Sequence, residues 1–172
     1  PVQWFWALAV AWGALEKVRV LFFSDKKCTE GPPVLGQCPL MSMVGFKANQ
    51  IRTLPAAALT PALRWLILTD NELEELPAEI GNCQHLQKLM LADNRLRTLP
   101  PELARCTNLE LLRLAANELP EPPEWLLTLP RLSRPACAGN PRPAPTAPGA
   151  HDRPAPAARP WHGPGADAGR GR

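Results

Sequence analysis

The sequence lacks the residue patterns that usually mark a catalytic or metal-binding protein. It contains no tyrosine, and its five cysteines form no CxxC pair. This cysteine usage argues for a reducing compartment or for buried free thiols rather than for a disulfide framework. The three histidines, His85, His151 and His162, have no partner at metal-ligand or catalytic-triad spacing. We therefore expect no metal, no cofactor and no catalytic centre.

Positive charge is also scarce in most of the chain. Residues 1–132 carry 13 Lys and Arg against 14 Asp and Glu, so the pI of 8.8 comes from the C-terminal segment. Without a surplus of cations to neutralise phosphates, nucleic acid is not the expected partner. The apolar stretch "WFWALAVAWGAL" (4–15) is too short to span a bilayer and lacks the flanks of a secretory signal. We expect no membrane partner.

What the sequence does have is an internal repeat. Five asparagines, Asn49, Asn71, Asn94, Asn117 and Asn140, are separated by 22, 23, 23 and 23 residues. Three segments aligned on them have leucine eight, five and three residues before the asparagine and two after it: "LRWLILTDNELEELP" (63–77), "LQKLMLADNRLRTLP" (86–100) and "LELLRLAANELPEPP" (109–123). The pattern L-x-x-L-x-L-x-x-N-x-L is the leucine-rich-repeat signature.

Two weaker copies precede these three. They are "MSMVGFKANQIRTLP" (41–55) and "VRVLFFSDKKCTEGP" (18–32), in which Lys26 stands where the asparagine is expected. Five repeats thus cover residues 18–132, and residues 1–17 are expected to form an apolar N-terminal cap or a decayed repeat. The pattern predicts an α/β leucine-rich-repeat solenoid, a short horseshoe arc with a parallel concave sheet and short convex helices or 3₁₀ turns.

Each repeat position has an expected role. Two leucines of each strand, such as Leu89 and Leu91, point into the core, and the asparagines Asn49, Asn71, Asn94 and Asn117 form a structural ladder in the turn. Cys38, Cys83 and Cys106 share one position and are expected to be packing residues. Charged residues fall into two columns in which the sign alternates from repeat to repeat. The first column is Glu72, Arg95 and Glu118, and the second is Arg52, Glu74 and Arg97. We expect solvated ion pairs there that contribute at most about 1 kcal/mol each.

The remaining strand residues point away from the core, because strand side chains alternate with a period of two. They are unusually apolar for an exposed face, and large exposed apolar patches mark interaction surfaces. The predicted partner-binding residues of this concave face are Val20, Phe22, Met43, Trp65, Ile67, Lys88, Met90, Leu111 and Arg113. In the alternative interpretation, the chain's own Trp-rich start or a further domain covers the N-terminal half of this face.

The repeats also resemble a particular family. The segments "LGQCPLMSMVGFKANQI", "ALRWLILTDNELEELP", "LQKLMLADNRL" and "LELLRLAANEL" closely resemble the repeat domain of bacterial leucine-rich-repeat proteins that carry a serine/threonine protein kinase domain after the repeats. The resemblance covers about 18–132 and implies a cytoplasmic bacterial signalling protein. A kinase needs a Gly-rich loop, a strand lysine, an HRD-type loop and a DFG metal site. None of these is present in the sequence.

The chain itself is therefore not expected to be an enzyme. The predicted function is a protein–protein interaction module that binds a partner protein or a sister domain through the concave face, with no small-molecule substrate. The alternative is the regulatory N-terminal fragment of a serine/threonine kinase whose catalytic domain is missing. The absent initiator Met is consistent with a fragment, and the ragged ends also leave open a gene remnant.

The C-terminal segment, residues 133–172, has a different composition. It is rich in Pro, Ala, Gly and Arg and has no Leu, Ile, Val or Phe. Such a segment buries too little apolar surface to offset the entropy of ordering, so a disordered tail is expected. The alternatives are a linker to another domain and the out-of-frame translation of GC-rich DNA, and we favour the latter.

Overall fold

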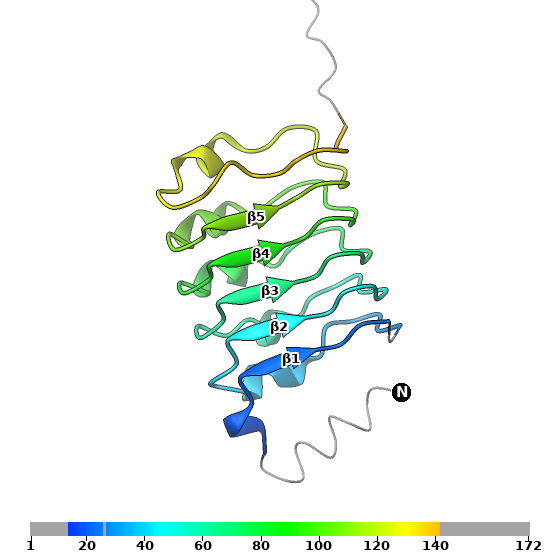
Figure 1. The fold of residues 1–172 in the computed structure, drawn as a ribbon, viewed down its shortest axis with the longest axis vertical. Helices are drawn as coiled ribbons and strands as arrows, with labels where there is room; N and C mark the ends of the chain where they lie inside the picture. The colour runs from blue at the N-terminus through cyan, green and yellow to red at the C-terminus, as the bar shows by residue number, and fades with distance from the viewer. Residues whose placement is uncertain (1–13, 26, 142–172) are drawn as a thin grey trace, which may run out of the picture.

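The computed structural model describes residues 14–25 and 27–141. Most of the predicted N-terminal cap, Lys26 and residues 142–172 of the predicted tail lie outside the described residues. In the described part, the chain forms a stack of similar coils, and five of them each contribute one strand to a single sheet (Figure 1).

The sheet consists of five short strands in sequence order. They are β1 (Val20–Phe22), β2 (Met43–Gly45), β3 (Trp65–Ile67), β4 (Lys88–Met90) and β5 (Leu111–Arg113), and each pairs in parallel with the next. The register pairs Leu21 with Val44, Val44 with Leu66, and Leu66 with Leu89. These are the partners that the repeat alignment predicts, so the alignment of the two weaker copies is confirmed.

The return limbs are 3₁₀ turns in every described coil. They are η1 (Ala14–Lys17), η2 (Pro33–Gln37), η3 (Ala56–Ala58), η4 (Ala78–Asn82), η5 (Pro101–Arg105) and η6 (Glu124–Thr128). A proline precedes each of η2 to η6. Hydrogen bonds between residues three apart then close the turns, such as the bond from the Cys83 N–H to the Ile80 C=O at 3.1 Å. A coil of 22–23 residues leaves little room for longer helices, and 3₁₀ geometry suits short segments.

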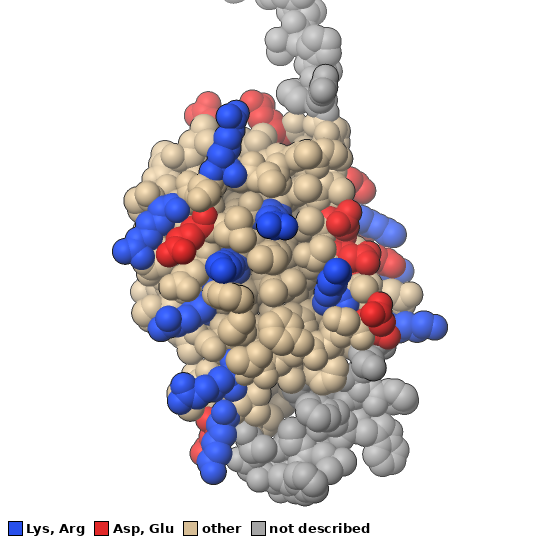
Figure 2. Space-filling view, in the orientation of Figure 1, with Lys and Arg blue, Asp and Glu red and all other residues tan. Residues whose placement is uncertain are grey.

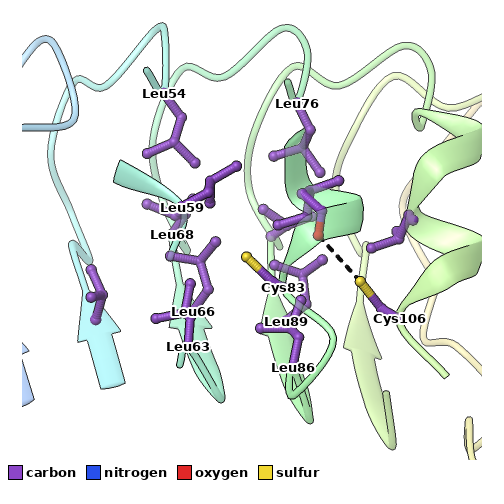
Figure 3. Packing of buried hydrophobic residues seen from close by; sticks show 14 of the residues in the cluster. Leu54, Leu59, Leu63, Leu66, Leu68, Leu76, Cys83, Leu86, Leu89 and Cys106 are labelled. Carbon is purple, nitrogen blue, oxygen red and sulfur yellow. Dashed lines mark hydrogen bonds between the residues drawn. The ribbon is translucent and has the colours of Figure 1, made fainter. Parts of the chain in front are cut away.

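The core lies between the sheet and the return limbs and repeats from coil to coil. In the coil of β4, Leu86, Leu89, Leu91 and Leu96 are fully buried, and the equivalent leucines of β3 lie directly beside them (Figure 3). Aromatic residues replace the leucines near the N-terminal end, where Phe23 stacks on Phe46 with ring centroids 6.0 Å apart. The inward leucines therefore form continuous ladders, as the repeat predicts.

The stack continues past Leu132, where the sequence analysis places the start of the tail. The Leu114 N–H donates to the Ala136 C=O at 2.9 Å, and the Ala116 N–H donates to the Ala138 C=O at 2.7 Å. Asn140 accepts a hydrogen bond from the Leu119 N–H at 3.0 Å. Residues 133–141, which the sequence analysis assigns to the tail, are thus hydrogen-bonded to the coil before them. The predicted tail starts where leucine residues end. In the structure, backbone hydrogen bonds and the Asn140 side chain hold this last coil, which has no leucine after Leu132.

Candidate functional site

The concave face is formed by the first and third residues of each strand. The first residues, Val20, Met43, Trp65, Lys88 and Leu111, form one column through the sheet register, and the third residues, Phe22, Gly45, Ile67, Met90 and Arg113, form a second. All nine predicted partner-binding residues thus lie in two adjacent columns. Val20 and Phe22 are the most exposed apolar members, at 48% and 53% exposure. Trp65, Ile67, Met90 and Leu111 are half-buried.

Phe22 does not project freely from the edge of the sheet. Its ring lies across Gly45 on the neighbouring strand, where a Cβ atom would collide with the ring atoms Cδ1 and Cε1. Gly45 is consequently buried although it occupies an outward position. The apolar surface of β1 therefore serves partly to cover the backbone of β2.

Lys88 and Trp65 form the most defined contact on the concave face. The two residues are register partners on β4 and β3, and the Lys88 Nζ atom lies 3.9 Å from the centroid of the Trp65 ring. An ammonium over an indole ring gains about 0.5–1 kcal/mol at an exposed site. The contact keeps the long lysine side chain folded over the sheet, so its charge lies above the apolar column.

Lys47 is a cation on this face that was not among the predicted site residues. Lys47 follows the buried Phe46, so the strand alternation directs its side chain outward on the side of Met43 and Gly45, and it is exposed. The sequence could have indicated this cation, because Lys47 comes directly after the second inward side chain of its repeat, Phe46. The equivalent residues Thr69, Ala92 and Ala115 are half-buried.

The asparagines form a ladder at the end of the strands, and it is structural. Asn71, Asn94 and Asn117 are buried, and each accepts a hydrogen bond from the preceding coil: Ile51, Leu73 and Leu96 donate their N–H groups at 3.0–3.1 Å. Asn49 is buried too and accepts from the Cys28 N–H at 3.2 Å. These side chains satisfy backbone groups inside the stack and are not available to a partner.

The residue before each asparagine has left-handed backbone geometry. Its φ is +60° at Asp70 and +56° at Asp93, and Gly139 has +78° at the equivalent place in the last coil. Ala48 and Ala116 adopt the same conformation, with φ of +53° and +52°. Glycine tolerates this region and Asp reaches it with local hydrogen bonding, whereas alanine is strained there.

The cysteine column lies in the core, as predicted. Cys38, Cys83 and Cys106 are fully buried, and the Cys106 thiol donates to the Ile80 C=O at 3.3 Å (Figure 3). Burial raises the pKa of the Cys83 thiol to about 12, with a smaller contribution from Cys106, and burial raises the pKa of Cys106 to about 11. Neutral, buried thiols are packing residues and not nucleophiles.

The charged columns form ion pairs along the margin beside the asparagine turns. Arg52 pairs with Glu72 at 3.1 Å, Arg95 pairs with Glu72 at 3.6 Å, and Arg97 pairs with Glu118 at 3.0 Å. The Arg52 and Arg97 pairs connect residues of the two predicted columns, whereas the Arg95 pair lies within one column. The arginine side chains are more than half exposed, so each pair contributes little to stability.

Within the described residues, no group of three His, Cys, Asp or Glu side chains is placed to hold a metal ion. None of the helices in that same part of the chain is long and apolar enough to cross a bilayer.

Comparison with known proteins bears on the whole stack. Residues 61–119 match the Leucine rich repeat family. No curated protein matches the chain. Among solved structures, the chain is similar to a leucine-rich-repeat protein from Leptospira interrogans, with a TM-score of 0.70 and 28% identity over 79% of this chain. The match covers 33% of the Leptospira protein, so this chain spans about a third of its length.

Two further structures have the same architecture. The ectodomain of the receptor kinase SOBIR1 from Arabidopsis thaliana has a TM-score of 0.61 and 25% identity, over 73% of this chain and 72% of that one. An internalin from Listeria monocytogenes has a TM-score of 0.62 at 20% identity, over 72% of this chain and 36% of that one, which shows the fold alone. The described part of this chain is thus a leucine-rich-repeat solenoid, and residues 61–119 carry the family match.

Proposed function

We propose that this chain is a protein-recognition module whose concave face binds a partner protein. The observation that carries the proposal is the pair of adjacent columns in which Trp65, Ile67, Met90 and Leu111 remain partly exposed although the residues behind them are buried. None of these four side chains belongs to the hydrophobic core cluster of the described residues. Tryptophan and methionine are suited to binding, the former as an anchor and the latter as an adaptable contact.

The test compares partner capture by the full chain with capture by the double variant Trp65→Ser, Met90→Ser. The tagged proteins are incubated with cell extract, and captured proteins are cross-linked and identified by mass spectrometry. We expect the double variant to lose its specific partner while keeping the circular dichroism spectrum and melting temperature of a folded solenoid.

A matched control removes exposed apolar side chains elsewhere. Leu40 and Leu127 are 45% and 77% exposed and lie outside the strands, so the double variant Leu40→Ser, Leu127→Ser changes surface hydrophobicity without touching the concave face. This control should capture the same partner as the unmodified chain. Equal capture by the concave-face variant and the control would contradict the proposal.

A second proposal keeps the kinase relation implied by the sequence resemblance. In it, the partner is a serine/threonine kinase domain of the same protein, and the repeats regulate that domain. The similarity to the ectodomain of a receptor kinase supports this proposal at the level of the repeats. Because the sequence carries none of the kinase motifs, we expect no ATP-dependent phosphorylation by this chain alone, and labelling of a substrate with radioactive ATP would reveal any.

We further propose a cytoplasmic location in a bacterial cell. The supporting observation is that Cys28, Cys38, Cys83, Cys106 and Cys137 are all free thiols, which a reducing compartment preserves. Fractionation of cells that express the tagged full-length protein tests this point, and recovery outside the cytoplasm would contradict it.

A further inference from the structure

The outward positions of the concave face carry cations but no carboxylates. They comprise the two columns already described, their continuation at Arg134 and Ala136, and the residue that follows each second inward side chain. Four of these positions are Lys47, Lys88, Arg113 and Arg134, and none is Asp or Glu in the described residues. Figure 2 shows the same distribution, with blue side chains over the middle of the sheet and red ones towards its margins.

None of these four cations forms an ion pair with another described residue. The ion pairs of the described residues involve only Arg52, Arg95 and Arg97, beside the asparagine turns. Asp70 and Asp93 flank the face in the turns, and Glu110 flanks it before β5, but none of them pairs with a cation of the face. In the described part of the chain, the face thus combines apolar side chains with cations that have no carboxylate partner.

The Trp65 ring positions the Lys88 ammonium where a ligand carboxylate can reach it. The Trp65 ring lies 3.9 Å below it, and no acidic side chain of the described residues occupies its other side. Because the ring restricts the lysine in advance, a ligand carboxylate meets a lower entropic cost than at a freely moving lysine. Arg113 stands on the neighbouring strand, diagonal to Lys88, with roughly 8 Å expected between their Cα atoms from standard strand spacings.

We propose that the partner segment is acidic and amphipathic, and that it binds over β3 to β5. Its carboxylates pair with Lys88 and Arg113, and its aromatic or aliphatic side chains contact Trp65, Ile67 and Met90. This inference rests on the proposed function and adds the chemistry of the partner. It follows from charge complementarity: a basic or neutral segment would leave the cations desolvated and unpaired, which costs affinity.

The experiment selects peptides from a random linear library displayed on phage, with the full chain as bait. A parallel selection uses the charge-reversed variant Lys88→Glu, Arg113→Glu. A third bait, Arg105→Glu, Arg131→Glu, makes the same change in net charge at exposed positions outside the strands. Selected peptides are synthesised, and their affinities are measured by fluorescence anisotropy at low and high salt.

We expect peptides from the unmodified chain to combine Asp or Glu with Trp, Phe or Leu. Charge reversal on the face should weaken their binding roughly tenfold or more, the equivalent of about 1.4 kcal/mol. The Arg105→Glu, Arg131→Glu variant should bind them nearly as well as the unmodified chain does. High salt should weaken the binding, because exposed charges are screened. The charge-reversed bait should itself select basic peptides.

The outcomes separate this inference from the function on which it rests. Peptides that require Trp65 and Met90 but show no acidic bias, or tolerate charge reversal, would overturn the inference and leave the concave face as the binding site. Peptides that bind the Trp65→Ser, Met90→Ser variant unchanged would count against both. Absence of any selected peptide, together with binding of the chain to phosphatidylserine vesicles that charge reversal abolishes, would replace the acidic peptide by a membrane surface.

Discussion

Replacement of Asn94 by alanine tests the ladder at one of its buried asparagines. The Asn94 Oδ1 atom accepts from the Leu73 N–H at 3.0 Å. Its Nδ2 atom donates to the C=O groups of Leu68, Leu91 and Ala92 at 2.9, 3.0 and 3.2 Å. The side chain therefore connects its own coil to the coil before it, and alanine removes all four contacts.

The cost follows from the groups that lose their only partner. The carbonyls keep other donors, since Asn71 Nδ2 still reaches the Leu68 C=O at 3.0 Å and Asn117 Nδ2 still reaches the Leu91 C=O at 2.9 Å. The Leu73 N–H has no second acceptor in the described part of the chain, and Leu73 is fully buried. An orphaned buried amide costs about 1–3 kcal/mol, so with the net value of the lost bonds we expect Asn94→Ala to destabilise by roughly 2–4 kcal/mol.

Urea denaturation followed by circular dichroism measures this change, and amide exchange by NMR locates it at Leu73. Asn140→Ala is the matched comparison, because its acceptor role serves Leu119 in a less buried coil, and its cost should be smaller. The stability of the Asn94→Asp variant should approach that of the unmodified chain at low pH, since only the neutral carboxyl group can both accept and donate hydrogen bonds. A loss below about 1 kcal/mol for Asn94→Ala, with Leu73 still protected, would refute this reasoning.

Three other predictions concern single positions. Ala116→Gly relieves an alanine in left-handed geometry and should raise the free energy of unfolding by up to about 1 kcal/mol, measured in urea; equal stability would contradict the assigned strain. Thr60→Val should leave the melting temperature unchanged or higher, because the Thr60 hydroxyl is buried without a partner among the described residues. The raised pKa of Cys83 means that stability is complete below its ordinary value of 9.0 and declines as pH rises towards about 12, because only the unfolded thiol ionises in that interval. A urea series against pH should show a weaker decline for Cys83→Ala, and thiol reagent at pH 8 should leave Cys83 unmodified until the chain unfolds.

The fold could be predicted from the sequence because the same core positions recur in each repeat. Leu89 and Asn94 are recognisable only through their equivalents at 22–23 residue spacing, and that spacing also fixed the sheet register. The repeat could not choose between α-helix and 3₁₀ turn in the return limbs. The 22–23 residue spacing favours the shorter element, but the apolar residues of such a short segment suit either one.

The end of the stack was harder to predict for a different reason. Hydrophobic pattern was the signal for a coil, whereas the coil of Ala136 is held by hydrogen bonds between backbone groups. Asn140 and Gly139 were the remaining signals, since they preserve the ladder and the left-handed turn after the leucines are lost. Backbone pairing is nearly independent of side-chain type, so composition alone gave no sign of the hydrogen bonds that residues 133–141 make.

The concave face is not uniform, and the difference between its halves limits where a partner can bind. At the N-terminal end, Phe22 already covers Gly45, and removing it would expose the backbone of β2. A partner that displaced this ring would have to replace that cover. Over β3 to β5, Trp65 and Met90 cover no such gap, and the Lys88 and Arg113 charges lack carboxylate partners among the described residues. A partner that binds over β3 to β5 therefore displaces no such cover, which agrees with the proposal that the apolar columns and the cations act as one binding surface.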